Sequence, residues 1–308
     1  MNKPRVERRE VNGWIALDKA VGQTSTDAVA ALKRLFRAKK AGHAGTLDPL
    51  ASGVLPIAFG EATKTVPFVM DGAKAYQFTV RWGIETDTDD SEGTAIERSD
   101  ARPSREALVA ALPSFTGIIE QTPPKYSALK IGGERAYDLA REGRAVELAP
   151  RPVEIHRLDL VEIPDAEHAV FKAECGKGTY VRAIARDLGR ATGCFGHVTA
   201  LRRVRVGPFD AGTAVSLQSL AALRDEGGED ALAGAVLPVE TGLSSLPSLA
   251  VSAADAQRLA RGQSVIVRGR DAPVLEGFVS VSAQGALVAL GEMAQGALHP
   301  RRIFHLSR

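Results

Sequence analysis

Strand-like segments recur along the chain without the regular strand–helix alternation that a parallel sheet with crossover helices requires. From Tyr76 to Trp82, apolar residues alternate with polar or small ones, which is the period of a half-buried strand. Further strands are predicted over residues 13–17, 54–59, 151–175 (two strands) and 197–206, and helices over 179–190 and from a cap at Ser25 or Thr26 to about residue 37. This mixture favours an α+β fold over a doubly wound α/β fold.

The C-terminal fifth of the chain differs from the rest. The full length of 308 residues is enough for one large domain and a smaller one. Residues 225–248 are rich in Gly, Ala, Ser and Pro and are predicted to form a linker. A helix-like segment (253–261) and short alternating strands follow. We therefore expect a catalytic domain over residues 1–248 and a small, mostly β domain over 249–308.

Basic residues are concentrated in three segments, although the net charge is only +2. Residues 1–40 contain ten Lys or Arg and four Asp or Glu. Residues 177–205 contain seven basic residues and one acidic residue, and residues 249–308 contain seven basic and four acidic residues. Separate basic segments suggest a polyanion-binding surface and therefore a nucleic acid partner. Solvated surface charge is the ordinary alternative.

Targeting and redox signals are few. No apolar run approaches the roughly 18–20 residues that span a bilayer, and the first ten residues lack the apolar core of a secretory signal. The two cysteines, Cys175 and Cys194, form neither a CxxC pair nor a zinc-ligand spacing. A cytoplasmic protein without membrane attachment is expected.

The most informative stretch is residues 41–56, AGHAGTLDPLASGVLP. A single acidic side chain, Asp48, lies in a loop of small residues, near His43 and just before an apolar strand. Glycines allow a backbone to approach a ligand closely, and Pro49 stiffens the chain after the carboxylate. From these residues alone, a tight turn in which Asp48 binds its own backbone remains the alternative.

An acidic run at residues 85–92 has the composition of a calcium loop. An EF-hand requires Gly at loop position 6 and Glu at position 12. Counted from Asp87, these positions hold Glu92 and Arg98, so the template fails. We predict no metal site.

Five ordered blocks resemble the TruB family of bacterial tRNA pseudouridine synthases and cover about residues 12–210. The blocks are GHAGTLDPLASGVLP followed by GEATK (42–64), GxxTxTxDxxG (83–93), YSALKxxGxxxYxxAR (126–141), KGTYVR (177–182) and HVxxLRR (197–203). Two departures from the family pattern are Ala20, where proline is usual, and Ala44, where threonine is common. Both affect the stiffness of a loop rather than its chemistry.

The resemblance implies a pseudouridine synthase fold with a mixed, mainly antiparallel sheet, and conversion of uridine 55 in the tRNA T loop to pseudouridine. It implies Asp48 as the catalytic carboxylate. A desolvated carboxylate stays charged only beside a cation. The resemblance implies that Arg182 is the cation paired with Asp48 and that Asp90 belongs to the same network. The T arm of tRNA is the expected partner, and we expect a monomer with no cofactor and no obligatory protein partner.

The resemblance also implies how the RNA is held. The target base must leave its stack before it can react, and an aromatic ring can then stabilise it by roughly 1–3 kcal/mol. The residues implied for base binding are Tyr76 as this ring, Tyr180, Leu201 and His43. Lys19 and Lys64 match supports of the active-site loops. The basic residues expected to contact RNA are Lys130, Arg141, Arg202 and Arg203.

Two further segments have counterparts in the family. Residues 121–151, with a short helix predicted over Glu134–Arg141, resemble a thumb-like insertion that closes over the T loop; an ordinary surface loop fits their composition too. Residues 249–308 resemble a PUA-type RNA-binding domain. The insertion resembles that of bacterial enzymes, which favours stand-alone action over guidance by an RNA.

Two other functions remain open at this point. A glycosidase or nucleosidase also uses carboxylates at a sugar carbon, but a glycosidase normally places two of them around the bond. An RNA-binding folding factor would use the same basic segments and tail without catalysis. Formation of pseudouridine on a T-loop transcript distinguishes the three.

Overall fold

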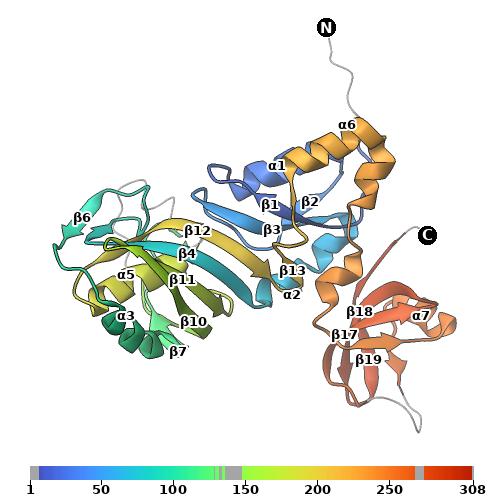
Figure 1. The fold of residues 1–308 in the computed structure, drawn as a ribbon. Coiled ribbons are helices and arrows are strands. Elements are labelled where there is room, and N and C mark those ends of the chain that lie inside the picture. The colour runs from blue at the N-terminus through green and yellow to red at the C-terminus, as the bar shows by residue number, and fades with distance from the viewer. Residues whose placement is uncertain (1–6, 128, 132–133, 136–147, 268–273, 307–308) are drawn as a thin grey trace.

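The computed structural model describes residues 7–127, 129–131, 134–135, 148–267 and 274–306. One large sheet dominates them, with the strand order β14-β1-β3-β12-β4-β11-β10-β7, β2 beside β3 and β13 beside β12 (Figure 1). Its strands are β1 (Gly13–Lys19), β2 (Ala41–His43), β3 (Ala51–Phe59), β4 (Lys74–Trp82), β7 (Gly117–Gln121), β10 (Arg151–Asp165), β11 (His168–Cys175), β12 (Gly196–Val206), β13 (Phe209–Asp210) and β14 (Val215–Ser216).

Most strand pairs in this sheet are antiparallel. The parallel pairs are β1 with β14 and β3 with β12. The strands predicted from alternation are present, and β4 has the expected pattern, with Tyr76, Phe78 and Val80 buried. The expectation of an α+β fold with a mixed, mainly antiparallel sheet is therefore confirmed.

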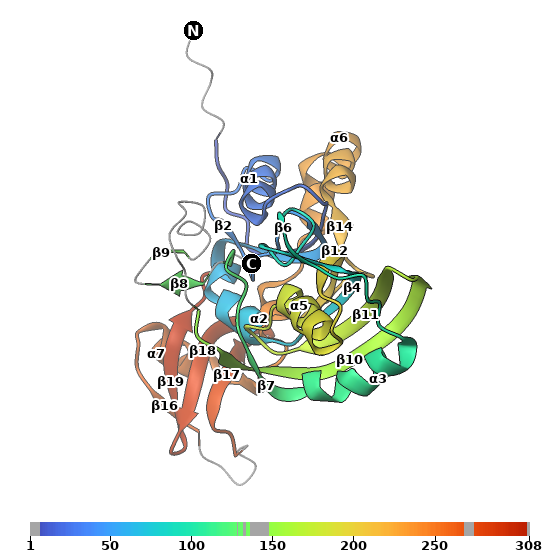
Figure 2. The same cartoon turned by 90° about the vertical axis from the view of Figure 1, so that its left-hand side faces the viewer.

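Helices pack on both halves of the sheet. Those of the sheet-forming region are α1 (Ser25–Leu35), α2 (Val66–Asp71), α3 (Arg105–Ala111), α5 (Val181–Ala191), α6 (Leu217–Gly234) and the 3₁₀ helices η1 (Gly60–Lys64), η2 (Leu112–Phe115) and η3 (Val239–Leu243). Figure 1 shows α1 and α6 beside the β1–β3 half, and Figure 2 shows α5 within the curve of β10 and β11. Ile184 and Leu188 of α5 pack in the same core as Phe78 and Phe171.

Two local predictions need correction. The N-cap of α1 is Thr24, not Ser25 or Thr26, since the Thr24 hydroxyl accepts from the Asp27 N–H at 3.0 Å. The linker predicted over 225–248 is wrong. α6 runs to Gly234 across a kink at Gly228, and Leu220, Leu232 and Leu243 are buried. Tertiary packing therefore overrides the weak helix propensity of a Gly-rich segment.

Short hairpins flank the main sheet. They are β5 (Ile84–Thr86) with β6 (Ala95–Arg98), and β8 (Lys130–Ile131) with β9 (Glu134–Arg135). The predicted helix from Glu134 to Arg141 does not begin at Glu134, because that residue belongs to β9. Residues 136–147, and Arg141 with them, lie outside the described residues.

The C-terminal region forms a second sheet in the order β15-β17-β18-β19-β16. Its elements are β15 (Ser248–Ala250), α7 (Ala253–Ala260), β16 (Val265–Ile266), β17 (Gly277–Ala283), β18 (Ala286–Ala294) and β19 (Ala297–Ile303). Leu287, Leu290 and Phe304 share a buried cluster with Ala62 and Val69 of the first region. The second sheet is thus packed against η1 and α2 through apolar side chains. No helix among the described residues is long and apolar enough to cross a membrane.

Candidate active site

Asp48 lies in the loop that joins β2 to β3. The loop is held from the α1 side, where the Ser25 hydroxyl bonds both the N–H and the carbonyl of Leu47, each at 2.9 Å. The Gly22 N–H donates to the Pro49 carbonyl at 2.7 Å. Gly45 has φ +101°, a conformation that strains residues with a side chain. These contacts fix the loop on both sides of the carboxylate.

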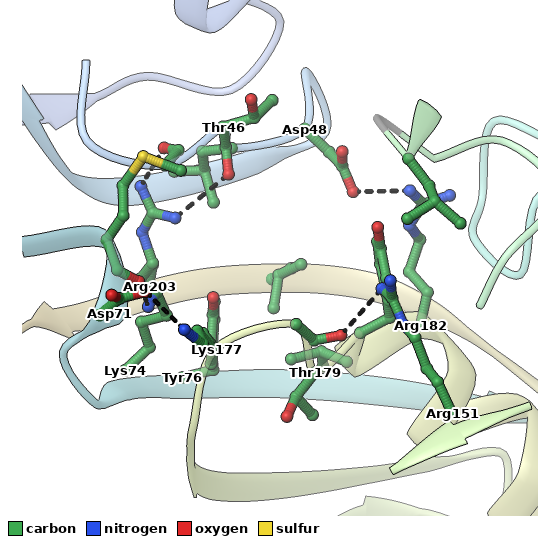
Figure 3. Close-up of a pocket in the computed structure, with 18 residues that line it drawn as sticks. Thr46, Asp48, Asp71, Lys74, Tyr76, Arg151, Lys177, Thr179, Arg182 and Arg203 are labelled. Carbon is green, nitrogen blue, oxygen red and sulfur yellow. Dashed lines mark hydrogen bonds and ion pairs between the residues drawn. The ribbon is translucent and has the colours of Figure 1, made fainter. Parts of the chain in front are cut away.

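The Asp48 carboxylate is ion-paired with Arg182, the second residue of α5. Asp48 Oδ2 lies 2.9 Å from Arg182 Nη2 (Figure 3). Arg182 Nη1 lies 3.2 Å from Asp90 Oδ2. The side chain of Asp48 is 35% exposed, whereas those of Arg182 and Asp90 are buried. The only one of the three groups open to a ligand is therefore the Asp48 carboxylate.

Arg182 is held rigidly in place. It donates to the Thr88 carbonyl at 2.8 Å and to the Tyr126 carbonyl at 2.9 Å. Asp90 in turn accepts from the Thr88 hydroxyl at 2.6 Å and from the Glu92 N–H at 3.0 Å. A buried charge pair is tolerated when its remaining donors and acceptors are satisfied in this way. The guanidinium is thus preorganised to pair with the Asp48 carboxylate.

A cavity of about 390 Å³ opens beside Asp48, near the lower end of the range for small-ligand sites. Tyr76, Tyr180 and Leu201 line it, so the structure brings these predicted base-binding residues together with Asp48. Tyr76 is 9% exposed and Leu201 7%. Burial raises the pKa of the Tyr76 hydroxyl, and the nearby charge of Arg203 opposes this only in part. Tyr76 therefore presents a neutral ring to the cavity.

Sequence reasoning missed several residues that shape this cavity. The buried Gln121 side chain clamps the backbone of Tyr180, accepting from its N–H at 2.8 Å and donating to its carbonyl at 3.2 Å. The Arg151 guanidinium lies 5.3 Å from the centre of the Tyr180 ring. Lys177 and Asp71 form an exposed ion pair at 2.9 Å on the cavity rim. Only Lys177, within the KGTY block, had a local sequence signal.

The acidic run that resembles a calcium loop is neutralised by arginines of α5. Asp90 pairs with Arg182, Asp89 with Arg186 at 2.9 Å, and Glu85 with Arg190. Arginines at a four-residue spacing share one face of a helix. This spacing is the sequence signal that could have predicted the row of three ion pairs. Burial raises the pKa of Asp89 to about 6, although the charge of Arg186 opposes the rise.

Lys19 lies at the end of β1, before the turn whose Gly22 N–H contacts the Asp48 loop. Its fully buried ammonium donates to the Ala20 carbonyl at 2.9 Å and to the Gln23 carbonyl at 2.7 Å. Burial lowers the pKa of Lys19 from 10.5 to about 8, and the charge of Asp48 acts in the opposite direction. Lys19 is therefore a titrating group inside the site.

The lowered pKa of Lys19 predicts a pH-dependent stability. Between about pH 8 and pH 10.5 Lys19 is neutral in the folded chain and protonated in the unfolded chain, so the unfolded chain binds more protons and stability rises with pH. Relative to Lys19→Met, the free energy of unfolding should rise between pH 8 and pH 10. Urea denaturation of both proteins at several pH values measures it. A stability difference that does not vary with pH would contradict the assignment.

Lys64 and His43 are not among the described residues that line the cavity. Lys64 donates to Glu61 Oε2 at 2.6 Å and to the Ile303 carbonyl at 2.8 Å, so it ties η1 to the C-terminal sheet and is not a support of the Asp48 loop. His43 lies on β2 opposite Ile57. Lys130 lies on β8.

The two adjacent arginines predicted to bind RNA lie in different environments. Arg202 is 42% exposed and forms two hydrogen bonds with the Asp18 carboxylate, at 2.9 and 3.0 Å. Arg203 is 2% exposed and lines the cavity. Strand alternation turns Arg203 inward, and its guanidinium donates to three carbonyl oxygens of the chain; its contact with RNA, which the resemblance implies, stays a prediction.

Comparisons with known proteins identify the family. The model of the TruB family pseudouridylate synthase N-terminal domain matches residues 33–181, and that of the tRNA pseudouridylate synthase B C-terminal domain matches residues 182–244. A protein of Nitrobacter winogradskyi named tRNA pseudouridine synthase B is 64% identical over 99% of this chain and 86% of its own length. A protein of Agrobacterium fabrum with the same name is 53% identical over 99% of this chain and all of its own length.

Solved structures agree with this grouping. A crystal structure of a Cbf5–Nop10–Gar1 complex contains a chain with a TM-score of 0.75 and 26% identity, over 95% of this chain and 85% of that one. A structure of an H/ACA ribonucleoprotein bound to a substrate RNA containing 2′-deoxyuridine contains a chain with a TM-score of 0.74 and 25% identity. The match covers 96% of this chain and 85% of that one. With two family models over its central part and relatives more than half identical along nearly its whole length, this chain belongs to the TruB family of pseudouridylate synthases.

Proposed function

We propose that this chain isomerises uridine 55 in the T loop of tRNA to pseudouridine, with Asp48 as the catalytic carboxylate. The observation that carries the proposal is the partly exposed Asp48 carboxylate, held 2.9 Å from the buried Arg182 at the edge of a cavity lined by tyrosines. Names of relatives that are 53–64% identical support the same activity.

The reaction needs no co-reactant, because product and substrate are isomers. The N1–C1′ bond breaks, the uracil turns, C5 bonds to C1′, and the proton of C5 is finally transferred to solvent while N1 gains one. Asp48 can assist either by attacking as a nucleophile or by removing a ribose proton. Both roles require a charged carboxylate at the sugar, which the pairing with Arg182 supplies.

The cavity is suited to a single flipped nucleotide. Tyr76 lies on β4 in the wall, and Tyr180 is held by Gln121 at the start of α5. Stacking on a tyrosine can offset much of the few kcal/mol that unstacking of a base costs. We assign Tyr76 to stacking, and Tyr180 and Leu201 to the other walls around the base. His43 is proposed to contact the RNA outside this cavity.

The arrangement of carboxylates disfavours a glycosidase. In that class two carboxyl groups flank the bond to be cleaved. Asp90, the other carboxylate bound to Arg182, is buried and accepts hydrogen bonds from Thr88 and Glu92. It shares one guanidinium with Asp48 rather than facing it across the cavity. The other carboxylate among the described lining residues, Asp71, is exposed at the rim and paired with Lys177, so neither Asp90 nor Asp71 is left free to act as a second catalytic carboxylate.

The test uses a T-arm hairpin and a full-length tRNA transcript with the purified chain alone. Release of tritium from C5-labelled uridine should reveal pseudouridine formation at one position, without added protein, guide RNA, metal or cofactor. Binding without turnover would favour the folding-factor alternative, and release of free uracil would favour a nucleosidase. Activity of the isolated chain would also support stand-alone action, without a protein partner or a guide RNA.

We also propose that residues 249–308 act as a PUA-like RNA-binding domain. Arg301 lies on β19 beside Glu292, and the neighbouring Arg302 is exposed; Arg268 and Arg270 lie outside the described residues. Truncation at residue 248 would remove Phe304 and expose the apolar residues that pack with it, such as Val69, so substitutions test the role more cleanly than deletion does.

Replacing these four arginines by Gln should weaken binding of full-length tRNA and reduce its salt dependence. The slope of log K against log salt should become shallower by up to about 0.9 for each phosphate that an arginine no longer neutralises. Binding of a short T-arm hairpin should change much less, because that RNA need not reach the tail. Filter binding at several salt concentrations measures both. Equal reductions in affinity for the two RNAs would contradict a distal binding surface.

A further inference from the structure

Arg203 occupies a junction between the catalytic loop and the base-stacking strand. On β12 it lies opposite Gly53 of β3, in parallel pairing, and opposite Tyr76 of β4, in antiparallel pairing. The backbones of β3 and β12 are in close contact here, because a Cβ on Gly53 would lie 2.2 Å from the Arg203 carbonyl oxygen. The base of the Arg203 side chain is therefore fixed between the two strands.

The guanidinium of Arg203 binds the chain on both sides of Asp48, in the loop before it and in β3 after it. Its Nη2 donates to the Gly45 carbonyl at 3.0 Å and its Nη1 to the Thr46 carbonyl at 3.2 Å. Its Nε donates to the Val54 carbonyl at 2.8 Å. Figure 3 shows Arg203 and Arg182 reaching the loop from opposite sides. One rigid fork thus joins the residues before Asp48 to the strand after it.

This charge is buried without an acidic partner. Arg203 is 2% exposed, and no ion pair within the described part of the chain includes it. Burial of a cation costs free energy unless dipoles or anions compensate it, and here backbone carbonyls do so. The charge acts on the surrounding site, since it lowers the pKa of Lys19 after the larger effect of burial. A residue needed only for packing could be apolar.

We propose that Arg203 is a positioning residue for the isomerisation: it sets the place of the Asp48 carboxylate relative to Tyr76 and to the bound nucleotide. The inference rests on the proposed function of the cavity. A lysine would keep the charge but would lack the planar fork that reaches three carbonyls at once. The geometry of the guanidinium, beyond its charge, is therefore what the loop requires.

The test compares Arg203→Lys and Arg203→Met with the wild-type chain. The control is Arg205→Lys, which alters an arginine of the same strand that pairs with Glu174 at the surface. Single-turnover rates at saturating T-arm RNA, equilibrium RNA affinity and thermal melting are measured for each. A misplacement of about 1 Å can cost roughly a hundredfold in rate. We expect Arg203→Lys to lose about 10- to 100-fold in rate with RNA affinity within about twofold, Arg203→Met to lose more, and Arg205→Lys to match wild type.

Each other result counts against the proposal. A wild-type rate for folded Arg203→Lys would show that the fork is not needed. A loss of RNA affinity as large as the loss of rate would make Arg203 a binding residue. Failure of both Arg203 variants to fold would make it a residue of the fold instead. Inactivity of the wild-type chain would refute the proposed function itself, which is a separate outcome.

Discussion

Asp48→Asn is expected to abolish pseudouridine formation and to leave tRNA affinity nearly unchanged. Asn keeps the size of the side chain but cannot act as an anionic nucleophile or take a proton from the ribose. RNA affinity depends mainly on phosphate contacts and shape, and Asp48 is one partly exposed group at the edge of the cavity. Single-turnover tritium release and filter binding measure the two quantities.

A matched control for Asp48→Asn is Asp159→Asn, since Asp159 is a surface carboxylate of β10 paired with Arg157. It loses the same charge and should keep both rate and affinity. Loss of an essential catalytic group usually costs far more than a hundredfold in rate. Residual turnover by Asp48→Asn above about one hundredth of wild type would therefore remove Asp48 from the catalytic role.

Arg182→Met should impair both catalysis and stability, for two different reasons. The Asp48 carboxylate loses its cation, and removal of one such electrostatic interaction typically costs about 100- to 1,000-fold in rate. The buried Asp90, whose side chain is 4% exposed, is left without its charge partner. Breaking a buried ion pair in this way typically costs about 3–5 kcal/mol of stability. Single-turnover kinetics and urea denaturation measure the two effects.

A double variant distinguishes the two effects of Arg182→Met. Adding Asp90→Asn removes the unpaired buried charge, so much of the stability should return. Activity should not return, because Asp48 still lacks its cation. If the double variant regains both stability and rate, Arg182 would serve only to neutralise Asp90, and its pairing with Asp48 would be incidental.

The sequence was most informative where periodicity is strong. The alternation in β4 and the amphipathic pattern of α5 predicted elements that are present within a few residues of the expected bounds. α6 was missed because Gly227 and Gly228 interrupt any helical pattern and few of its side chains are buried, Leu220 and Leu232 among them. The contacts that stabilise this helix come from distant segments, which composition does not reveal.

In the site, too, residues within local motifs were predicted well, whereas contacts between distant segments were not. Asp48, Tyr76, Tyr180, Leu201 and Arg182 meet at one cavity, as the family resemblance implied. Lys64 was misplaced because its partner, the Ile303 carbonyl, is 239 residues away in sequence. For Arg203, however, a local signal existed.

Adjacent residues on a strand face opposite sides, so Arg202 and Arg203 could not both contact RNA from the same face. Leu201, two residues before Arg203, is the neighbour that shares its side of the sheet. Strand alternation therefore predicts different environments for the two arginines.

Mapping of pseudouridine in tRNA from cells with and without this gene tests the central claim most directly. The account predicts that uridine 55 is unmodified when the gene is deleted, that the wild-type gene restores pseudouridine there, and that the gene carrying Asp48→Asn does not. Pseudouridine at position 55 in the deletion strain, or its restoration by Asp48→Asn, would contradict the account.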